Sequence, residues 1–328
     1  MSAKSLSVLI VGCGGIAGIF DQYRQSSDLP LTHAGAFSHD DRFNIVACVE
    51  PDDNRRGEFM KFWNVLKGYS SIDEVASSGK TFDIISICSP TVNHAYNLEF
   101  AIQIKPKLIF CEKPITTSLS ETKELVNKCK KDNILLAVNY TRRWDLEILK
   151  LQLDIQSGRR GQLRSVTGNY NKGILNNGSH MLDLLNFLVG PLKIVKVGKP
   201  VQDFSPDDPT IPVWLEGYKG LPIHLACGHA EDYSLFELQM VFSNSILSME
   251  DGGMYWRERQ VINSDIFKDY KKLDDGIRRV GEYPRAMLQA IENIYGAINE
   301  GMPLASTGES AIVVQQLCEQ IKHLTINT

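Results

Sequence analysis

The sequence predicts an α/β protein of two domains. Residues 1–140 would form a doubly wound parallel sheet, and residues 141–328 an α/β domain with an open, mostly antiparallel sheet. The length of 328 residues exceeds one typical core, which favours two domains. In the first domain, short apolar runs alternate with helical patterns, as buried parallel strands do. In the second, strand-like runs are separated by Gly, Pro, Asn and Asp, as antiparallel strands are.

The expected strands of the first domain are apolar on both faces and end at polar or glycine-containing turns. They are Val8–Val11, Phe43–Val49, Asp83–Cys88, Leu108–Cys111 and Ile134–Val138. Helices are expected between them, among others at Val92–Ile104 and Ser120–Lys131. Because strands that alternate with helices use right-handed crossovers, one parallel sheet with helices on both faces follows.

The second domain is expected to begin with a helix, Leu146–Gln156, and a half-buried strand, Leu163–Tyr170. A helix over Ser179–Val189 ends at Gly190-Pro191, a strong stop signal. Asp203–Pro212, rich in Pro and Asp, is predicted to be a loop. Further strands are expected at Ile194–Val201, Ile211–Glu216, Ile223–Cys227, Phe236–Phe242 and Ser245–Glu250, then two helices at Pro284–Glu300 and Gly308–Leu324. The final helix can pack back on the first domain.

The composition bounds the functional class. Apolar residues make up 43% and charged residues 23%, the balance of a soluble globular protein. A net charge of -4 gives no electrostatic reason to expect nucleic acid or a membrane surface, and no apolar run approaches the length of a membrane span. The 7 cysteines show no pair at metal-ligand spacing, so we expect buried free thiols, no metal site and a reducing cytoplasm.

The first strand runs into a glycine-rich turn, Gly12-x-Gly14-x-x-Ala17, which is the dinucleotide-binding fingerprint in its Ala-ending form. Gly12 permits the tight turn, Gly14 lets the backbone approach a pyrophosphate, and Ala17 lets the helix pack close to the strand. The phosphates would bind N–H groups of the first helical turn, where Gly15 and Ile16 lie. A glycine-rich turn without a ligand is the alternative.

Glu50 ends the second predicted strand, where a carboxylate can accept hydrogen bonds from both ribose hydroxyls. The same charge repels a 2′-phosphate, so NAD is favoured over NADP. Arg55 and Arg56 follow and could soften this discrimination. The spacing from Gly14 is longer than usual and requires an extended loop or additional turn within residues 21–39. A solvated strand-end carboxylate is the alternative.

Glu112-Lys113-Pro114 comes directly after an apolar strand. A lysine at the carboxyl end of a central parallel strand points into the crevice where ligands of such sheets bind. It can polarise a substrate hydroxyl next to a nicotinamide ring, and the following proline fixes the turn. The alternative is a lysine that is merely solvated.

A second candidate for catalysis is His180, in the segment Asn176-Asn177-Gly178-Ser179-His180. Ser179, or the residue before it, can cap a helix and so place His180 in the first turn, with Asp183 one turn on. A helix N-terminus keeps a histidine neutral, which suits a general base for oxidation of an alcohol. A core or cap histidine is the alternative.

The order of these motifs resembles the Gfo/Idh/MocA family (glucose–fructose oxidoreductase / inositol dehydrogenase). The resemblance covers nearly the whole chain and includes Ser89-Pro90, His94, Glu112-Lys113-Pro114 and Gly178-x-His180-x-x-Asp183. It implies a Rossmann domain and a C-terminal α/β domain whose sheet often forms a subunit interface, hence a homodimer or homotetramer. It also implies that Ser89, Pro90, His94, Glu112 and Lys113 lie at the cofactor. The implied activity is nicotinamide-dependent oxidation or reduction of sugars, polyols or related carbonyls.

One position departs from the family pattern. Dehydrogenases of the family commonly carry an aspartate four residues before the histidine, and this chain has Asn176. An amide can bind a hydroxyl but cannot take a proton, which shifts weight to Lys113 and His180. The Asn176-Asn177 version resembles relatives that act on nucleotide-linked sugars. By the same resemblance, further substrate contacts are expected from Tyr140, Arg142, Arg143 and Lys172; a cluster at a domain hinge is the alternative for the two arginines.

Three other classes remain as alternatives. A non-catalytic dinucleotide-binding sensor or regulator would keep the cofactor site and lose the chemistry, which Asn176 permits. A redox-neutral glycosidase that uses bound NAD would release sugar without net NADH. An S-adenosylmethionine methyltransferase shares the glycine turn and the acidic strand end, but it gives no reason for Lys113 or His180.

Overall fold

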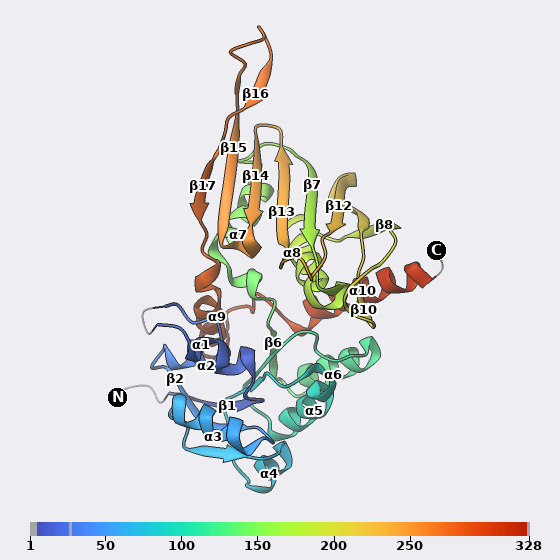
Figure 1. The fold of residues 1–328 in the computed structure, drawn as a ribbon. Coiled ribbons are helices and arrows are strands. Elements are labelled where there is room, and N and C mark those ends of the chain that lie inside the picture. The colour runs from blue at the N-terminus through green and yellow to red at the C-terminus, as the bar shows by residue number, and fades with distance from the viewer. Residues whose placement is uncertain (1–4, 26–27, 327–328) are drawn as a thin grey trace. The chain divides into compact units, whose positions relative to one another are not determined.

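The computed structural model describes residues 5–25 and 28–326 (Figure 1). The chain divides into two compact units. Unit 1 comprises Met1–Trp144 and Pro284–Ile312, and unit 2 comprises Asp145–Tyr283 and Val313–Thr328. The chain therefore returns to unit 1 late, with helix α9 (Ala286–Glu300) and the start of helix α10 (Gly308–Ile326).

Unit 1 is built on a six-stranded sheet in the order β3-β2-β1-β4-β5-β6, in which every pair is parallel. The strand order reverses between β1 and β4, which makes this edge the switch point where ligands of such sheets bind. The prediction of a doubly wound parallel sheet is confirmed, and β3 is an additional strand. The strands are β1 (Leu6–Val11), β2 (Phe43–Val49), β3 (Lys67–Tyr69), β4 (Ile84–Ile87), β5 (Leu108–Cys111) and β6 (Leu135–Val138).

The helices of unit 1 lie between its strands and on both faces of the sheet (Figure 1). They are α3 (Asp53–Phe62), α4 (Ile72–Ser77), α5 (His94–Ile104) and α6 (Leu119–Lys131), with a short 3₁₀ turn, η2 (Thr91–Asn93), before α5. Asp52 and Ser71 cap α3 and α4 by accepting backbone N–H groups. From α9, buried Met287, Ile291 and Ile294 join the core that contains the strands.

The segment between β1 and β2 contains the additional structure that its length predicts. A π-helix, η1 (Gly15–Ile19), leads into a single turn, α1 (Phe20–Gln22), and a separate helix, α2 (His33–Ser38), precedes β2. The Asp21 carboxylate accepts hydrogen bonds from the N–H groups of Leu31 and Thr32 and from the Thr32 hydroxyl. Thr32 in turn caps α2. The inserted residues thus end in a fixed second helix that lies against the sheet.

Unit 2 is built on a nine-stranded sheet in the order β16-β15-β14-β13-β7-β12-β11-β8, with β17 also paired to β15. Only the β7–β12 pair is parallel among these strands, which confirms the open, mostly antiparallel sheet. The strands are β7 (Leu163–Tyr170), β8 (Lys193–Val197), β11 (Val213–Gly217), β12 (Leu221–Cys227), β13 (Phe236–Phe242), β14 (Ser245–Glu250), β15 (Tyr255–Asn263), β16 (Lys271–Leu273) and β17 (Ile277–Val280).

Helices α7 (Leu146–Ser157) and α8 (Ser179–Val189) pack on one face of this sheet (Figure 1). The contact is close at Gly168, where a Cβ would lie 3.2 Å from the sulfur of Met181. Along β13, Phe236, Leu238, Met240 and Phe242 are buried while the residues between them are more exposed, so that one face of the strand forms the core.

Two predictions for unit 2 are wrong. Asp203–Pro212 is not a loop, because β9 (Val201–Ser205) and β10 (Asp208–Thr210) pair there as a small antiparallel sheet. The expected strand Ile194–Val201 is interrupted at Gly198, so that β8 and β9 belong to different sheets. Asp203 and Asp208 of the hairpin are buried and accept hydrogen bonds, which sequence composition alone does not indicate.

All seven cysteines are free, and six of them are buried. No described helix is long and apolar enough to cross a membrane. Among residues 5–25 and 28–326 there is no group of three or more His, Cys, Asp or Glu residues that could hold a metal ion.

Candidate functional site

The predicted site residues lie in two sets, one in each unit. In unit 1 they follow the carboxyl ends of neighbouring parallel strands: the glycine turn follows β1, Glu50 follows β2, Ser89 follows β4 and Lys113 follows β5. The carboxyl ends of parallel strands meet at one edge of a sheet, so these groups share the edge where ligands of doubly wound sheets bind.

The glycine turn is shaped by two different steric demands. Gly12 has φ +87°, and a Cβ there would lie 2.6 Å from the backbone nitrogen of Ser89, so only glycine fits this approach of two loops. At Gly14, by contrast, a Cβ would meet nothing within 4 Å. The open space beside Gly14 fits the expectation that a ligand approaches the backbone there. Gly15 and Ile16 follow in the first turn of η1, with their side-chain positions half-buried.

Two small residues, Ala17 and Gly18, let the helix after the turn pack closely, where the sequence predicts only Ala17. Ala17 is fully buried as predicted, and the neighbouring Gly18 packs so tightly that a Cβ would lie 2.3 Å from Nε1 of Trp63. The helix after the turn is the π-helix η1 rather than a regular α-helix. π-Helical turns are uncommon and often lie at functional sites.

Glu50 is buried at the end of β2, and its carboxylate is part of the glycine turn itself. Oε2 accepts a hydrogen bond from the Cys13 N–H at 3.0 Å, and Oε1 accepts one from the Asp52 N–H at 3.2 Å. The Arg55 guanidinium lies 3.5 Å from Oε1, with its side chain about half exposed. Arg56 is held differently, because it donates to the Glu50 carbonyl at 2.6 Å. Arg55 therefore lies beside the carboxylate that is expected to bind a ribose, whereas Arg56 is held by the backbone of the same residue.

His94 joins two loops of the edge. Its Nδ1 lies 2.9 Å from the Pro114 carbonyl oxygen, and its Nε2 lies 2.7 Å from the Ser89 carbonyl oxygen. Carbonyl oxygens only accept hydrogen bonds, so whichever ring nitrogen carries the proton donates to one of the two loops. His94 thus ties the Ser89-Pro90 loop to the Lys113-Pro114 turn, whose peptide bond is cis. Asn97 supports the first loop by donating to the Ser89 hydroxyl at 2.8 Å.

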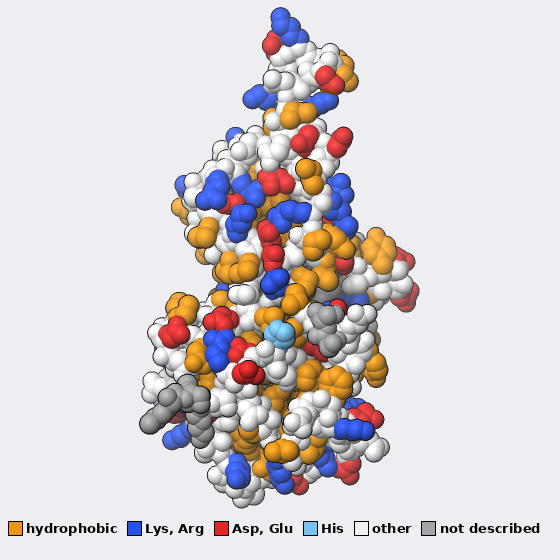
Figure 2. Space-filling view, turned by 90° about the vertical axis from the view of Figure 1, so that its left-hand side faces the viewer, with side chains coloured by type: hydrophobic (Ala, Val, Ile, Leu, Met, Phe, Trp, Pro, Cys, Tyr) orange, Lys and Arg blue, Asp and Glu red, His pale blue; other side chains and the backbone are white. Residues whose placement is uncertain are grey.

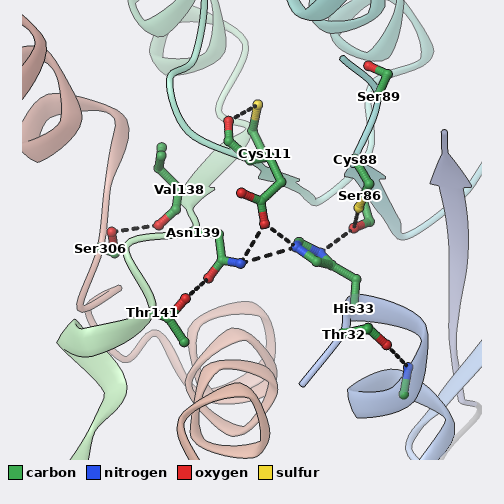
Figure 3. A network of polar contacts seen from close by, with 12 residues as sticks. Thr32, His33, Ser86, Cys88, Ser89, Cys111, Val138, Asn139, Thr141 and Ser306 are labelled. Atoms are coloured by element: carbon green, nitrogen blue, oxygen red, sulfur yellow. Dashed lines mark hydrogen bonds and ion pairs between the residues drawn. The ribbon is translucent and has the colours of Figure 1, made fainter. Parts of the chain in front are cut away.

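Glu112 is half-buried and belongs to a polar network around the buried His33, Ser86 and Asn139 (Figure 3). Its Oε1 lies 2.9 Å from Nε2 of His33 and accepts a hydrogen bond from Nδ2 of Asn139 at 2.6 Å. On the other side of the ring, Nδ1 of His33 lies 2.7 Å from the Ser86 hydroxyl. Thr141 completes the network by donating to Oδ1 of Asn139 at 3.0 Å.

The electrostatics of this network follow from burial and pairing. Burial alone would lower the pKa of His33, but Cys88 and the Glu112 carboxylate outweigh it and raise the pKa to about 10. Burial would conversely raise the pKa of Glu112, and the His33 imidazole lowers it overall. The pair is therefore a buried imidazolium and a half-buried carboxylate, and the carboxylate belongs to the residue directly before Lys113.

Sequence reasoning missed His33, Ser86 and Asn139. His33 lies in the segment between β1 and β2, and its partners Ser86 and Glu112 are 53 and 79 residues away. A lone histidine carries little information in a sequence, whereas a glutamate between an apolar strand and an expected catalytic lysine is a signal that could have prompted a search for its counter-charge.

The expected substrate contacts after β6 lie mostly inside unit 1. Tyr140 is 2% exposed and Arg143 is 7% exposed, while Arg142 is half-buried. Arg143 donates to the Ala305 carbonyl oxygen at 3.2 Å, and the next residue, Trp144, donates from Nε1 to Asn293 at 3.0 Å. These bonds give Arg143 a structural partner in the segment after α9.

In unit 2, the predicted residues Asn176, Asn177 and His180 belong to one continuous helical segment. A π-helix, η4 (Gly173–Gly178), runs directly into α8, and Lys172 precedes it in the left-handed conformation with φ +64°. Asn176, Asn177 and His180 are half-buried. Asp183, one turn after His180, is buried.

Helix α8 begins at Ser179 as predicted, but the expected side-chain cap is found neither at Ser179 nor at Gly178 before it. Ser179 has helical backbone angles, and its hydroxyl donates back to the Asn176 carbonyl oxygen at 3.0 Å. The first N–H groups of the helical segment are instead capped from the β9–β10 hairpin: the Asp208 carboxylate accepts from Leu175 at 2.8 Å and from Asn176 at 3.0 Å. His180 therefore lies beyond the first turn of the segment, where the field of the helix terminus has faded.

Asp203 and Thr210 complete this cap. Asp203 accepts a hydrogen bond from the Lys172 N–H at 3.0 Å and another from the Thr210 hydroxyl. The same hydroxyl accepts the Gly173 N–H at 2.8 Å. Buried acceptors from one hairpin thus fix the backbone that presents Asn176 and His180.

A cavity of about 1040 Å³ also opens in unit 2, between the ends of α7 and α8 and the turn before β12. None of the predicted site residues lines it. The candidate site is therefore defined by the predicted polar and charged residues of the two units and not by this cavity.

Comparison with known proteins agrees with this geometry. Residues 6–140 match the family model GFO_IDH_MocA, described as an oxidoreductase family with an NAD-binding Rossmann fold. By this match, the N-terminal domain, residues 6–140, is of the Gfo/Idh/MocA type. The expected family, its Rossmann domain and NAD as the cofactor are thereby confirmed.

Curated relatives match over shorter stretches. An uncharacterized oxidoreductase, YrbE, of Bacillus subtilis is 40% identical over 79 residues, which are 24% of this chain and 23% of that protein. Myo-inositol 2-dehydrogenase of Thermotoga maritima is 26% identical over 118 residues, 36% of this chain and 35% of that protein. The matches thus span about a quarter to a third of these relatives' own length.

Solved structures match over nearly the full length. The WlbA dehydrogenase from Bordetella pertussis, in complex with NADH and UDP-GlcNAcA, superposes with a TM-score of 0.74 at 16% identity and covers 98% of this chain and 97% of that one. At this identity the likeness establishes the fold of both units.

Proposed function

We propose that the protein is an NAD-dependent oxidoreductase that moves a hydride between nicotinamide and a hydroxyl-bearing carbon of a sugar, nucleotide sugar or polyol. The observation that carries this proposal is the carboxyl edge of the parallel sheet. There the open space at Gly14, the Glu50 carboxylate and Lys113 follow strands β1, β2 and β5 of the same parallel sheet. Names of relatives and neighbours, among them an inositol dehydrogenase and a structure with a UDP-sugar, support the substrate class.

The residues of unit 1 fit a bound dinucleotide. N–H groups of the turn from Gly14 to Ile16 would hold its phosphates, and Glu50 would hold the adenosine ribose. Glu50 Oε2 accepts one hydrogen bond, from Cys13, and retains a second acceptor position for a hydroxyl. When bound, NAD supplies the acceptor for the hydride, while this chain supplies binding, orientation and proton transfer.

We assign the proton chemistry to Lys113 and His180. A lysine ammonium donates hydrogen bonds to an alcohol oxygen and stabilises the negative charge that develops on it, which lowers the barrier to loss of its proton. His180 would exchange that proton as an imidazole, a role for which Asn176 is chemically unsuited because an amide does not ionise. Asn176, Asn177 and Lys172 then serve as hydrogen-bonding partners of the substrate, as do Arg142 and the less exposed Tyr140 and Arg143.

The test measures cofactor binding and turnover separately. Thermal unfolding with NADH, NADPH, S-adenosylmethionine and no ligand should show the largest shift with NADH, and a panel of polyols, sugars and UDP-sugars should then reveal reduction of NAD⁺. The Lys113→Ala variant should lose at least about a hundredfold in kcat while NADH affinity changes little. Lys123→Ala, on the exposed face of α6, is the matched control.

Normal turnover in Lys113→Ala would refute the assigned mechanism. Tight NADH binding without turnover of any substrate in the panel would favour a sensor or regulator, the alternative that Asn176 supports. Release of sugar without net NADH would favour a redox-neutral glycosidase.

A further inference from the structure

The buried histidine of α2 is the strongest feature that the proposed chemistry leaves unused. His33 is 0% exposed, lies with its ring centroid 4.3 Å from that of Phe110, and places both ring nitrogens on polar partners (Figure 3). A carboxylate largely removed from water, such as Glu112 with a side chain 13% exposed, is costly unless it is paired and hydrogen-bonded, and His33 with Asn139 supplies both requirements at Oε1.

We propose that His33 is a positioning residue for Lys113: it holds the Glu112 carboxylate inside the sheet and keeps that carboxylate from becoming the counter-ion of the lysine. The inference rests on the role proposed above for Lys113. It concerns the residue directly before the lysine, so any reorientation of Glu112 is transmitted through one peptide unit.

The charged and titratable groups around the network limit what can replace His33. From β4, Ser86 and Cys88 face the imidazole. From β5 and the turn after it come the buried Cys111 thiol, Glu112 and Lys113, while Asn139 after β6 is neutral. His33 and Lys113 are therefore the two cations of this group that can neutralise Glu112.

Competition between these two cations has a chemical consequence. Lys113 already lowers the pKa of Glu112 by its charge, as the weaker partner after His33 and Asn139. Without the imidazolium, the carboxylate would stabilise the ammonium form of Lys113 and raise the pKa of the lysine. An ammonium that is held by the Glu112 carboxylate has less of its charge and fewer of its donors available to an alcohol oxygen, so pairing with Glu112 would weaken the role proposed for Lys113.

The experiment measures the pKa of Lys113 by competitive chemical labelling of the full-length protein across pH, with mass spectrometry of the peptide that contains it. In His33→Gln, whose neutral amide retains a donor near the position of Nε2, the labelling pKa of Lys113 should rise by about one unit. In the double variant His33→Gln with Glu112→Gln it should return to the wild-type value. Ser86→Ala, which removes only the partner of Nδ1, should leave it unchanged.

An unchanged pKa of Lys113 in His33→Gln would overturn the proposal, as would a rise that persists in the double variant. Glu112→Gln alone provides a second test if His33→Gln does not fold. The labelling pKa of Lys113 should then stay at the wild-type value, whereas a fall would show that Glu112 is already its counter-ion. The labelling experiment needs no substrate. If the wild-type protein shows no turnover, that result counts against the proposed function, and the labelling experiment still tests the role of His33.

Discussion

At the scale of single residues, Glu50 has two roles that its position at the end of β2 combines. Its Oε2 holds the Cys13 N–H of the glycine turn, and the same carboxylate is the expected ribose acceptor. Glu50→Gln keeps an oxygen for Cys13 and removes the charge. We expect NADH affinity to fall about tenfold, because hydrogen bonds to charged groups contribute roughly 1.5–3 kcal/mol.

The same variant should narrow or reverse the preference for NADH over NADPH, since the half-exposed Arg55 beside Oε1 would then be free to bind a 2′-phosphate. Fluorescence titration with both cofactors measures this. Asp53→Asn is the control, because Asp53 lies in the same region with an 85% exposed side chain. If Glu50→Gln binds NADH and NADPH with the same two affinities as the wild type does, the role of Glu50 is contradicted.

The pair of His33 and Glu112 predicts how stability depends on pH. The folded-state pKa of His33 is about 10 against an ordinary 6.5, so its stabilisation is complete below pH 6.5 and is lost as the pH rises toward 10. For Glu112, whose pKa is lowered from 4.5, the contribution is present above that pH and is lost on acidification.

Urea unfolding at pH 6, 8 and 9.5 checks the alkaline side. The free energy of unfolding should fall by on the order of 1 kcal/mol per pH unit in this window because of His33. In His33→Gln this part of the slope should be absent. A wild-type stability that does not fall between pH 6.5 and 10 would contradict the imidazolium state of His33.

The sequence predicts the position of a residue correctly where that residue directly follows a strand. Glu50 and Lys113 could be placed because the strands before them are continuous apolar runs. His33 could not, because its meaning depends on Ser86 and Glu112, which only the fold brings to it. For Glu112 the sequence likewise shows the position after a strand and not the buried partner His33, while its expected contact with the cofactor stays a prediction.

At the scale of elements, the β9–β10 hairpin has a structural role that the sequence does not predict. Its Pro and Asp residues are typical of loops, yet Asp203, Asp208 and Thr210 are buried as acceptors for the backbone of η4. The sequence also placed the start of the helix at Ser179, since a capping residue there is a common signal. The cap comes instead from a hairpin about thirty residues later in the chain, at Asp208, 33 residues from Leu175.

Asp208→Asn should weaken this cap, because an amide offers one acceptor oxygen where the carboxylate offers two. We expect a loss of about 1–2 kcal/mol in the free energy of unfolding, typical of a lost helix cap. If the turn presents Asn176 and His180 to the substrate, KM should rise while NADH affinity is unchanged, since the cofactor edge lies in unit 1.

Asp207→Asn is the matched control, because Asp207 is the neighbouring residue with an exposed side chain. Denaturant unfolding, NADH titration and steady-state kinetics of both variants provide the comparison. If Asp208→Asn has the free energy of unfolding of the wild type, the cap contributes little to stability. If the variant loses NADH affinity, the cap affects the cofactor edge as well as the substrate residues, which contradicts the prediction.

At the scale of the whole molecule, the two fold types could be predicted because their hydrophobic periods differ. Buried parallel strands are apolar throughout, while β13 and its neighbours alternate. The late return of the chain to unit 1 is harder to predict from the sequence. The apolar positions of α9 indicate an amphipathic helix, but they do not show which sheet Met287 and Ile291 cover.

One feature of unit 2 has no cover within the described chain. The hairpin of β15 and β16 extends past the ends of β13 and β14, and the residues at its tip, Ile266, Phe267 and Tyr270, are 76%, 63% and 69% exposed (Figures 1 and 2). An isolated two-stranded hairpin is only marginally stable in water, and clustered exposed apolar side chains mark interaction surfaces. Asp265, Lys268, Asp269 and Lys271 alternate in sign around the tip, which suits contact with an identical hairpin.

We therefore expect a second copy of this chain to cover the tip, in the homodimer or homotetramer that the family resemblance implies. Light scattering coupled to size-exclusion chromatography should give a multiple of the 36.8 kDa chain mass for the wild type. Combined replacement of Ile266, Phe267 and Tyr270 by serine should reduce the assembly size and leave NADH affinity unchanged. Leu153→Ser, at a 62% exposed position on α7, tests whether loss of any exposed apolar side chain has this effect. A monomeric wild type, or a tip variant that assembles like wild type, would contradict the expectation, because the hairpin would then be stable without a partner.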